Sequence, residues 1–173
     1  MMPSLLSPLE MPAIDGLKMP RNFYIVLREP SLLAGMSYPE VFTPWEKMKA
    51  AGFTGVVCLC DSRVSYDPSP LRVLYSAELE DLHLGNSPRN PEYQEALVRQ
   101  AAAFVGRKME TGEGVVVHCM GGIGRTGMVL GCVLRDLGFS AGVVIDYLDR
   151  INRLRGVRGW PETEWQAEMV RKY

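Results

Sequence analysis

The sequence is poor in the residues that build metal centres and disulfide scaffolds. It holds two histidines, His83 and His118, and four cysteines in 173 residues. Two histidines exclude a histidine-rich metal centre, and four cysteines are too few for a disulfide-stabilised scaffold of this size. A mixed site made of Cys58, Cys60 and both histidines is disfavoured, because the single residue between the cysteines is fewer than the usual gap of about two to four. We therefore expect no metal and no cofactor.

A charge imbalance and a long apolar run are also absent. The 19 basic and 20 acidic side chains leave a net charge of −1, which excludes a nucleic-acid binder that depends on bulk positive charge. No apolar run approaches the roughly 18 residues that span a bilayer, and the start of the chain lacks the basic region of a signal peptide. We expect a cytoplasmic protein with no nucleic-acid or membrane partner, and the oligomeric state stays open.

Length and pattern indicate one α/β domain. With 47% apolar side chains, the chain can bury a single core. Residues 1–20 carry four of the twelve prolines and are expected to form an N-terminal arm, followed by one domain over 21–173. Apolar runs of strand length alternate along the chain with segments whose apolar residues recur at helical spacing. This alternation predicts a mainly parallel central sheet flanked by helices. Strands are expected at 22–27, 55–60, 72–75 and 115–119, helices at 45–51, 91–111, 128–137, 141–154 and from 161 onward, and a loop from residue 28 to residue 39.

The most informative segment is 117–127, where a strand-like run passes into a glycine-rich turn that opens a helix. Four of the seventeen glycines fall within this segment. The backbone N–H groups of such a turn can converge on an anion, and the helix N-terminus adds a favourable field. The residues expected to bind phosphate are Met120, Gly121, Gly122, Ile123, Gly124 and Arg125.

Cys119 and Arg125 make this turn a candidate reaction centre. A thiol at a helix N-terminus, beside N–H donors and a guanidinium, is stabilised as the thiolate. The planar fork of Arg125 can hold two phosphoryl oxygens at once. A nucleotide-binding P-loop would need Lys-Ser/Thr after its last glycine, which this segment lacks. The segment also partly matches the dinucleotide-binding pattern G-x-G-x-x-G, but that pattern does not explain Cys119 or Arg125. The segment therefore indicates a nucleophile aimed at a phosphorus atom.

His118-Cys119, five further residues and Arg125-Thr126-Gly127 resemble the H-C-x5-R-[ST]-G signature of cysteine-dependent protein-tyrosine and dual-specificity phosphatases. The size of the chain is similar to that of the compact dual-specificity branch. Two other families are less similar. Low-molecular-weight tyrosine phosphatases carry their phosphate-binding loop at the start of the chain, whereas Cys119 lies late in this one, and rhodanese-like domains lack this glycine pattern. The resemblance implies a tyrosine-phosphatase-like fold and a two-step reaction through a cysteinyl phosphate, with Cys119 as nucleophile and Arg125 holding the phosphoryl oxygens.

The resemblance also implies a general-acid aspartate on a loop before the nucleophile. The last aspartate before Cys119 is Asp81, which would protonate the leaving oxygen and then accept a proton from the hydrolytic water. The familiar Trp-Pro-Asp context is missing there. Trp160-Pro161-Glu162 looks similar, but it follows the nucleophile in the chain and is therefore interpreted as a decoy, that is, as a segment that does not supply the general acid. The alternatives for the acid are Asp61, Asp67, Glu78 and Glu80.

Three supporting roles follow from the same resemblance. Thr126 is expected to hydrogen-bond the thiolate, His118 to brace the loop from outside, and Gln166 to orient the hydrolytic water. Downstream, Arg153, Arg155 and Arg158 are interpreted as a solvated helix end rather than as a basic patch that faces the substrate.

The remaining cysteines are expected to be structural. Cys58 and Cys60 are predicted to point to opposite faces of their strand and to pack in the core. A redox alternative is that peroxide joins Cys60 to Cys119, which requires Cα atoms no more than about 7 Å apart.

The sequence therefore predicts a phosphomonoester hydrolase that dephosphorylates phosphotyrosine proteins, with phosphoserine and phosphothreonine as further substrates. Met120 and Ile123 are apolar, whereas phosphoinositide-cleaving relatives usually carry lysines in this loop. The alternatives are an inositol-phosphate phosphatase, a catalytically idle phosphate-binding module and a nucleotide-binding domain.

Overall fold

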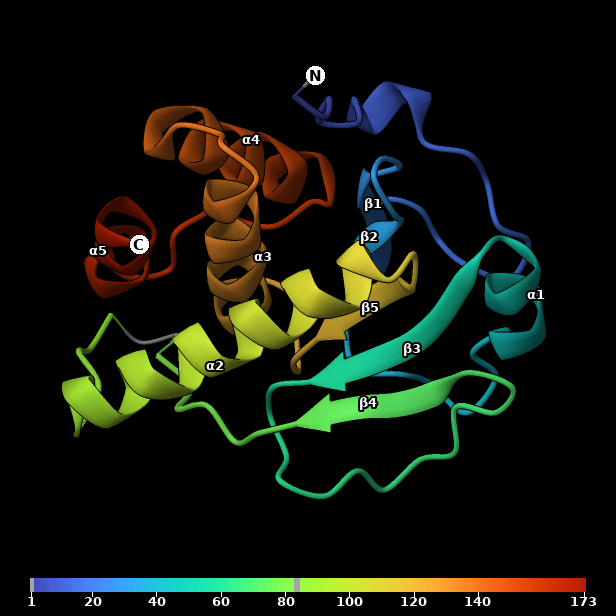
Figure 1. Ribbon diagram of the computed structural model, residues 1–173, viewed down its shortest axis with the longest axis horizontal. Coiled ribbons are helices and arrows are strands. Elements are labelled where there is room, and N and C mark those ends of the chain that lie inside the picture. Colours follow the sequence, from blue (N-terminus) through green and yellow to red (C-terminus); the bar gives the residue numbers. More distant parts are fainter. Residues whose placement is uncertain (1, 83–84) are drawn as a thin grey trace.

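A five-stranded sheet forms the centre of the computed structural model, which describes residues 2–82 and 85–173 (Figure 1). The spatial order is β1-β2-β5-β3-β4. The β1–β2 pair is antiparallel and the other three pairs are parallel, so the predicted mainly parallel sheet is confirmed. The strands are β1 Phe23–Leu27, β2 Leu33–Met36, β3 Phe53–Cys58, β4 Arg72–Ser76 and β5 Gly114–His118.

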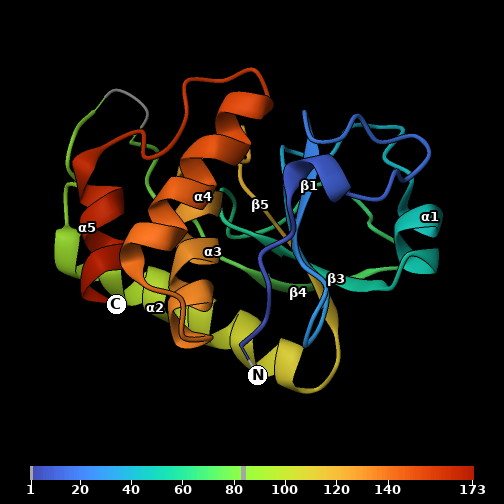
Figure 2. The ribbon, with the colours of Figure 1, turned by 90° about the horizontal axis from the view of Figure 1, so that it is seen from above.

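Helices cover the two faces of the sheet unequally (Figures 1 and 2). One face packs against α2 and α3, with α4 and α5 packed on α3, and the other face packs against α1 and part of the N-terminal arm. The central strands β3 and β5 are buried on both faces, which explains their nearly unbroken apolar sequences. The helices are α1 Trp45–Ala50, α2 Pro91–Glu110, α3 Gly124–Asp136, α4 Ala141–Leu154 and α5 Glu164–Lys172, with a 3₁₀ turn at Pro8–Glu10.

The prediction of a loop from residue 28 to residue 39 is wrong, because this segment contains β2. Gly35 weakens the strand pattern of the sequence. In the structure Gly35 packs directly against the ring of Tyr24, and a Cβ at this position would overlap that ring. Pairing with β1 on one side and β5 on the other therefore outweighs the low strand propensity of glycine.

The N-terminal arm lies against the domain in its described part. The Leu6 N–H donates to Val26 O at 2.9 Å, and the Tyr147 hydroxyl of α4 donates to Leu6 O at 2.8 Å. Ile14 is buried in the core beside α1. The division into an arm and a domain at residue 20 stays a prediction. In the described ranges, no helix is long and apolar enough to cross a membrane.

The carboxyl ends of three neighbouring strands meet at one edge of the sheet. His118, the last residue of β5, pairs with Met36 of β2 and with Cys58 of β3. The chain leaves β5 at this edge, makes the glycine-rich turn and enters α3. Open α/β sheets commonly bind ligands at this edge, and the predicted site residues gather here.

Candidate active site

The glycine loop, residues 119–125, is held by hydrogen bonds to its carbonyl groups. Each backbone carbonyl from residue 119 to residue 124 accepts at least one hydrogen bond. Because the C=O and N–H of a trans peptide point in opposite directions, these contacts turn the N–H groups of the loop toward its concave side. The donors are His118 Nδ1 to Cys119 O (3.0 Å), Tyr38 N to Met120 O (2.8 Å), Arg155 Nη2 to Gly121 O (2.8 Å), Tyr24 Oη and Arg155 Nη1 to Gly122 O (both 2.8 Å), Gly127 N to Ile123 O (2.9 Å) and Trp160 Nε1 to Gly124 O (3.4 Å).

Gly122 is the position of the loop that requires glycine most clearly. Its φ of +68° lies in the left-handed region, which side chains other than glycine rarely adopt. A Cβ there would also clash with the backbone oxygen of Met36 in β2. The loop can therefore sit directly on the end of β2 only without a side chain at this position.

Arg155 is a structural anchor of the glycine loop, so its interpretation as part of a solvated helix end is wrong. It is 6% exposed, whereas Arg153 and Arg158 are exposed. Its guanidinium lies 4.7 Å from the centre of the Tyr24 ring and donates to two loop carbonyls. Burial raises the pKa of Tyr24, so the phenol stays protonated and donates to Gly122 O. The two side chains together fix one wall of the loop.

Replacing Arg155 by methionine should lower the free energy of unfolding by about 2–4 kcal/mol, because buried carbonyl groups lose their donors. It should also weaken the binding of inorganic phosphate about tenfold, because the loop N–H groups lose their fixed direction. Urea denaturation and titration calorimetry measure the two effects. Arg150→Met, on the exposed side of α4, is the matched control. Unchanged stability and phosphate affinity would contradict the anchoring role.

A cavity of about 160 Å³ opens above the loop and brings together several predicted site residues. Cys119 lies at its base and is only 2% exposed, and Arg125 is 7% exposed. Such burial shields charges from water and strengthens their interactions. The described residues that line the cavity are Asp81, Cys119, Met120, Gly121, Ile123, Gly124, Arg125 and Glu162.

The Cys119 sulfur has a hydrogen-bond donor within the first turn of α3. The buried hydroxyl of Thr126 lies 3.1 Å from Cys119 Sγ and donates to it. A donated hydrogen bond favours the charged form of an acceptor. The sulfur therefore sits at a helix N-terminus, next to a hydroxyl donor and above a loop that presents N–H groups, which is an arrangement suited to a nucleophilic thiolate.

Asp81 reaches the cavity from the segment that follows β4. Its Oδ2 lies 3.3 Å from Arg125 Nη2, and Arg125 Nη1 donates to Leu79 O at 3.3 Å. Asp61 accepts from the Tyr38 hydroxyl and Asp67 binds Ser69, and these two aspartates do not line the cavity. The same holds for Glu78 and Glu80. Of the five carboxylates considered as the acid, Asp81 is the one that lines the cavity.

His118 is fully buried and points away from the cavity. Its Nδ1 donates to Cys119 O, and its Nε2 accepts from the Tyr66 hydroxyl at 2.6 Å. Burial raises the pKa of Tyr66 and keeps its hydroxyl protonated. The imidazole therefore links the glycine loop to the loop between β3 and β4 that carries Tyr66.

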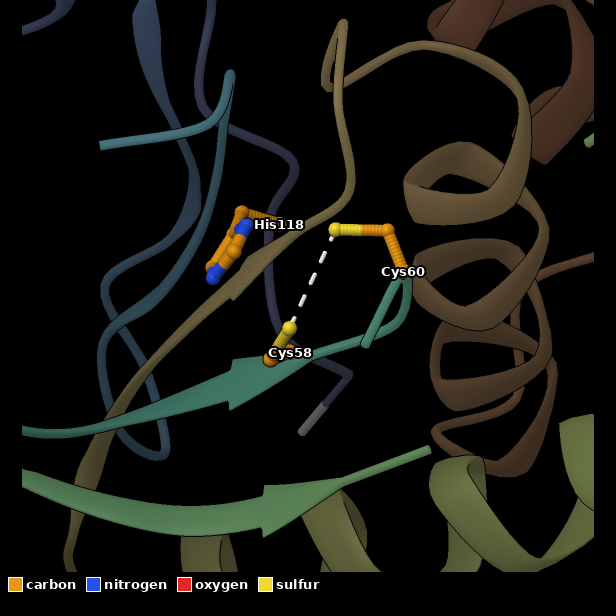
Figure 3. Close-up of side chains that lie close together, drawn as sticks. All are labelled: Cys58, Cys60 and His118. Atoms are coloured by element: carbon orange, nitrogen blue, oxygen red, sulfur yellow. Dashed lines mark hydrogen bonds between the residues drawn. The ribbon is translucent and has the colours of Figure 1, made fainter. Parts of the chain in front are cut away.

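Cys58 and Cys60 face each other beside His118, so the prediction of opposite faces is wrong (Figure 3). Their sulfurs are 3.9 Å apart, because residues two apart along extended chain point to the same side. A hydrogen bond from the Cys60 thiol lowers the pKa of Cys58, and the same contact together with burial raises that of Cys60. Of the four side chains considered for a mixed metal site, Cys58, Cys60 and His118 lie close together. The fourth, His83, lies outside the described residues.

Gln166 lies behind the cavity wall, whereas Glu162 lines the cavity. Gln166 is fully buried, and its Oε1 accepts from the N–H groups of Glu162 (2.8 Å) and Thr163 (3.4 Å). Both Glu162 Oε2 and Gln166 Nε2 pack so tightly on Gly124 that a Cβ there would overlap them. The interpretation of Trp160–Glu162 as a decoy rested on chain order, which does not fix position in space.

The comparison with protein families gives one match over most of the chain. The model of the PTP-SAK family, described as "Swiss Army Knife protein, DSP-PTPase phosphatase domain", matches residues 20–167. This range includes the whole sheet, the glycine loop, Asp81 and Glu162.

Solved phosphatase structures share the fold. Tk-PTP in its active form is 24% identical, with 81% of this chain and 89% of that chain covered and a TM-score of 0.58. PTPMT1 in complex with PI(5)P is 14% identical, covers 81% and 88%, and has a TM-score of 0.61. The core catalytic domain of the PP-IP phosphatase SIW14 from S. cerevisiae is 14% identical, covers 82% and 80%, and has a TM-score of 0.60. At these identities the likeness establishes the fold and leaves the substrate open.

Proposed function

This chain belongs to the PTP-SAK family of DSP-PTPase phosphatase domains, and from that premise we propose that it dephosphorylates phosphotyrosine in proteins through a cysteinyl phosphate. Phosphoserine and phosphothreonine proteins are the secondary substrates in this proposal. The observation that carries it is the cavity in which the Cys119 sulfur, the Arg125 guanidinium and the Asp81 carboxylate meet.

In the first step, the Cys119 thiolate attacks phosphorus in line. The P–O bond to the leaving group breaks, its electron pair stays on the leaving oxygen, and Asp81 gives that oxygen a proton. Arg125 and the loop N–H groups hold the nonbridging oxygens, more strongly in the transition state than in the ground state. Asp81 is paired with Arg125, and phosphoryl oxygens that bind Arg125 would release this carboxyl group for proton transfer.

The chemistry of the rim supports a single phosphate on an aromatic carrier. Met120 is 56% exposed and apolar, and Ile123 is half-buried beside it. Asp81 and Glu162 place two carboxyl groups around the cavity. The Glu162 carboxylate close to the reacting phosphate repels a second phosphate group, so a polyphosphorylated inositol is a poorer fit than phosphotyrosine.

A panel of substrates tests this proposal. We expect kcat/KM for a phosphotyrosine peptide to exceed that for the matched phosphoserine peptide, PI(5)P and an inositol pyrophosphate by about tenfold or more, which corresponds to about 1.4 kcal/mol. Faster turnover of either inositol compound would favour an inositol-phosphate phosphatase. Binding of inorganic phosphate without turnover of any substrate would favour the idle binding module.

A further inference from the structure

Glu162 is the second carboxyl group of the cavity. It comes from the segment between α4 and α5, far along the chain from Asp81, and lines the same space as Cys119 and Arg125. Gly124 lets it come this close, because a side chain at that position would occupy the place of the carboxylate. Its backbone is fixed by the 2.8 Å hydrogen bond from its N–H to Gln166 Oε1. The position of Glu162 is therefore set by the fully buried Gln166 side chain.

A carboxylate beside a phosphate site weakens the binding of a phosphoryl dianion by charge repulsion. This loss of binding is compensated where the carboxylate donates or accepts a proton in the reaction. The proposed reaction has two proton transfers, one to the leaving oxygen and one from the hydrolytic water. Asp81, paired with Arg125, serves the first transfer, which leaves the second for Glu162.

We propose that Glu162 is the general base of the second step, an inference that rests on the proposed function. In this step a water oxygen attacks the phosphorus of the cysteinyl phosphate while Glu162 takes a proton from that water. The P–S bond breaks, its electron pair returns to Cys119 Sγ as the thiolate, and inorganic phosphate leaves. Gln166 then acts as a positioning residue that holds Glu162, rather than as the residue that contacts the water.

Pre-steady-state kinetics of Glu162→Gln test this inference with p-nitrophenyl phosphate. The amide can hold a water but cannot take its proton, so hydrolysis of the intermediate should slow about 10- to 100-fold. The first turnover should stay near the wild-type rate. We expect a burst of one nitrophenolate per enzyme, and mass spectrometry of the acid-quenched protein should find one phosphoryl group on the Cys119 peptide.

Glu164→Gln is the matched control, because Glu164 is an exposed carboxylate two residues further on that pairs with Arg171. It should show wild-type rates and no burst. Glu162→Gln without a burst, or with its first turnover slowed as much as its steady state, would overturn the role in the second step. The proposed function fails separately, if wild-type enzyme releases no nitrophenolate or if Cys119→Ser releases it at the wild-type rate.

Discussion

Cys119→Ser should abolish turnover of phosphomonoesters, with kcat lower by about four orders of magnitude or more. A serine hydroxyl is a far weaker nucleophile than the thiolate that the Thr126 hydroxyl and the start of α3 support. The loop N–H groups and Arg125 remain, so the variant should still bind inorganic phosphate. Turnover of p-nitrophenyl phosphate and calorimetry of phosphate binding measure the two properties.

Cys132→Ala is the control for this result, because Cys132 is a buried thiol of α3 that does not line the cavity. It should keep turnover within a few-fold of wild type. Alkylation gives a second measurement: iodoacetate near pH 6 should inactivate the enzyme by modifying Cys119, and vanadate should protect it. Modification of Cys58 with loss of activity and an unmodified Cys119 would contradict the assignment of the nucleophile.

Asp81→Asn should slow the hydrolysis of an alkyl phosphate about 10²- to 10⁴-fold, while p-nitrophenyl phosphate loses less than about tenfold. The reason is the leaving group: an alkoxide is strongly basic and needs a proton in the transition state, whereas nitrophenolate departs as the anion. Asparagine keeps the shape of the side chain next to Arg125 but cannot donate a carboxyl proton. The ratio of kcat/KM for the two substrates measures the effect independently of enzyme concentration.

Asp61→Asn provides the comparison, since Asp61 was an alternative from the sequence and lies outside the cavity lining. It should leave the ratio between the two substrates unchanged. If Asp81→Asn behaves like wild type on the alkyl phosphate, the acid is another residue, and Glu162 is the next to test because it lines the same cavity.

The parts of the site that are contiguous in sequence could be predicted from the sequence. Cys119, Arg125 and Thr126 lie within one turn between a strand and a helix, so their spacing alone indicates the phosphate chemistry. The central strands β3 and β5 could be predicted because burial on both faces leaves an unbroken apolar run.

Residues that act through distant contacts could not be predicted in this way. Arg155 has the sequence context of an exposed helix end, and only the folded chain shows that it reaches the carbonyls of Gly121 and Gly122. Glu162 follows the nucleophile in sequence, and packing of α5 on α3 carries it back to the cavity. β2 could not be predicted, because its stability comes from strand pairing on both sides rather than from its own residues.

The hydrogen bonds to the glycine loop make anion binding a property of the whole fold. The donors outside α3 are Tyr24, Tyr38, His118, Arg155 and Trp160, so the loop shape requires β1, the residues that follow β2, the end of β5 and the segment between α4 and α5. A phosphate ion that binds only this shape stabilises the native state against global unfolding, by about 2.7 kcal/mol at a concentration 100 times Kd. Thermodynamically, the occupied site and the assembled core are one cooperative unit, and the thermal unfolding midpoint reports on both.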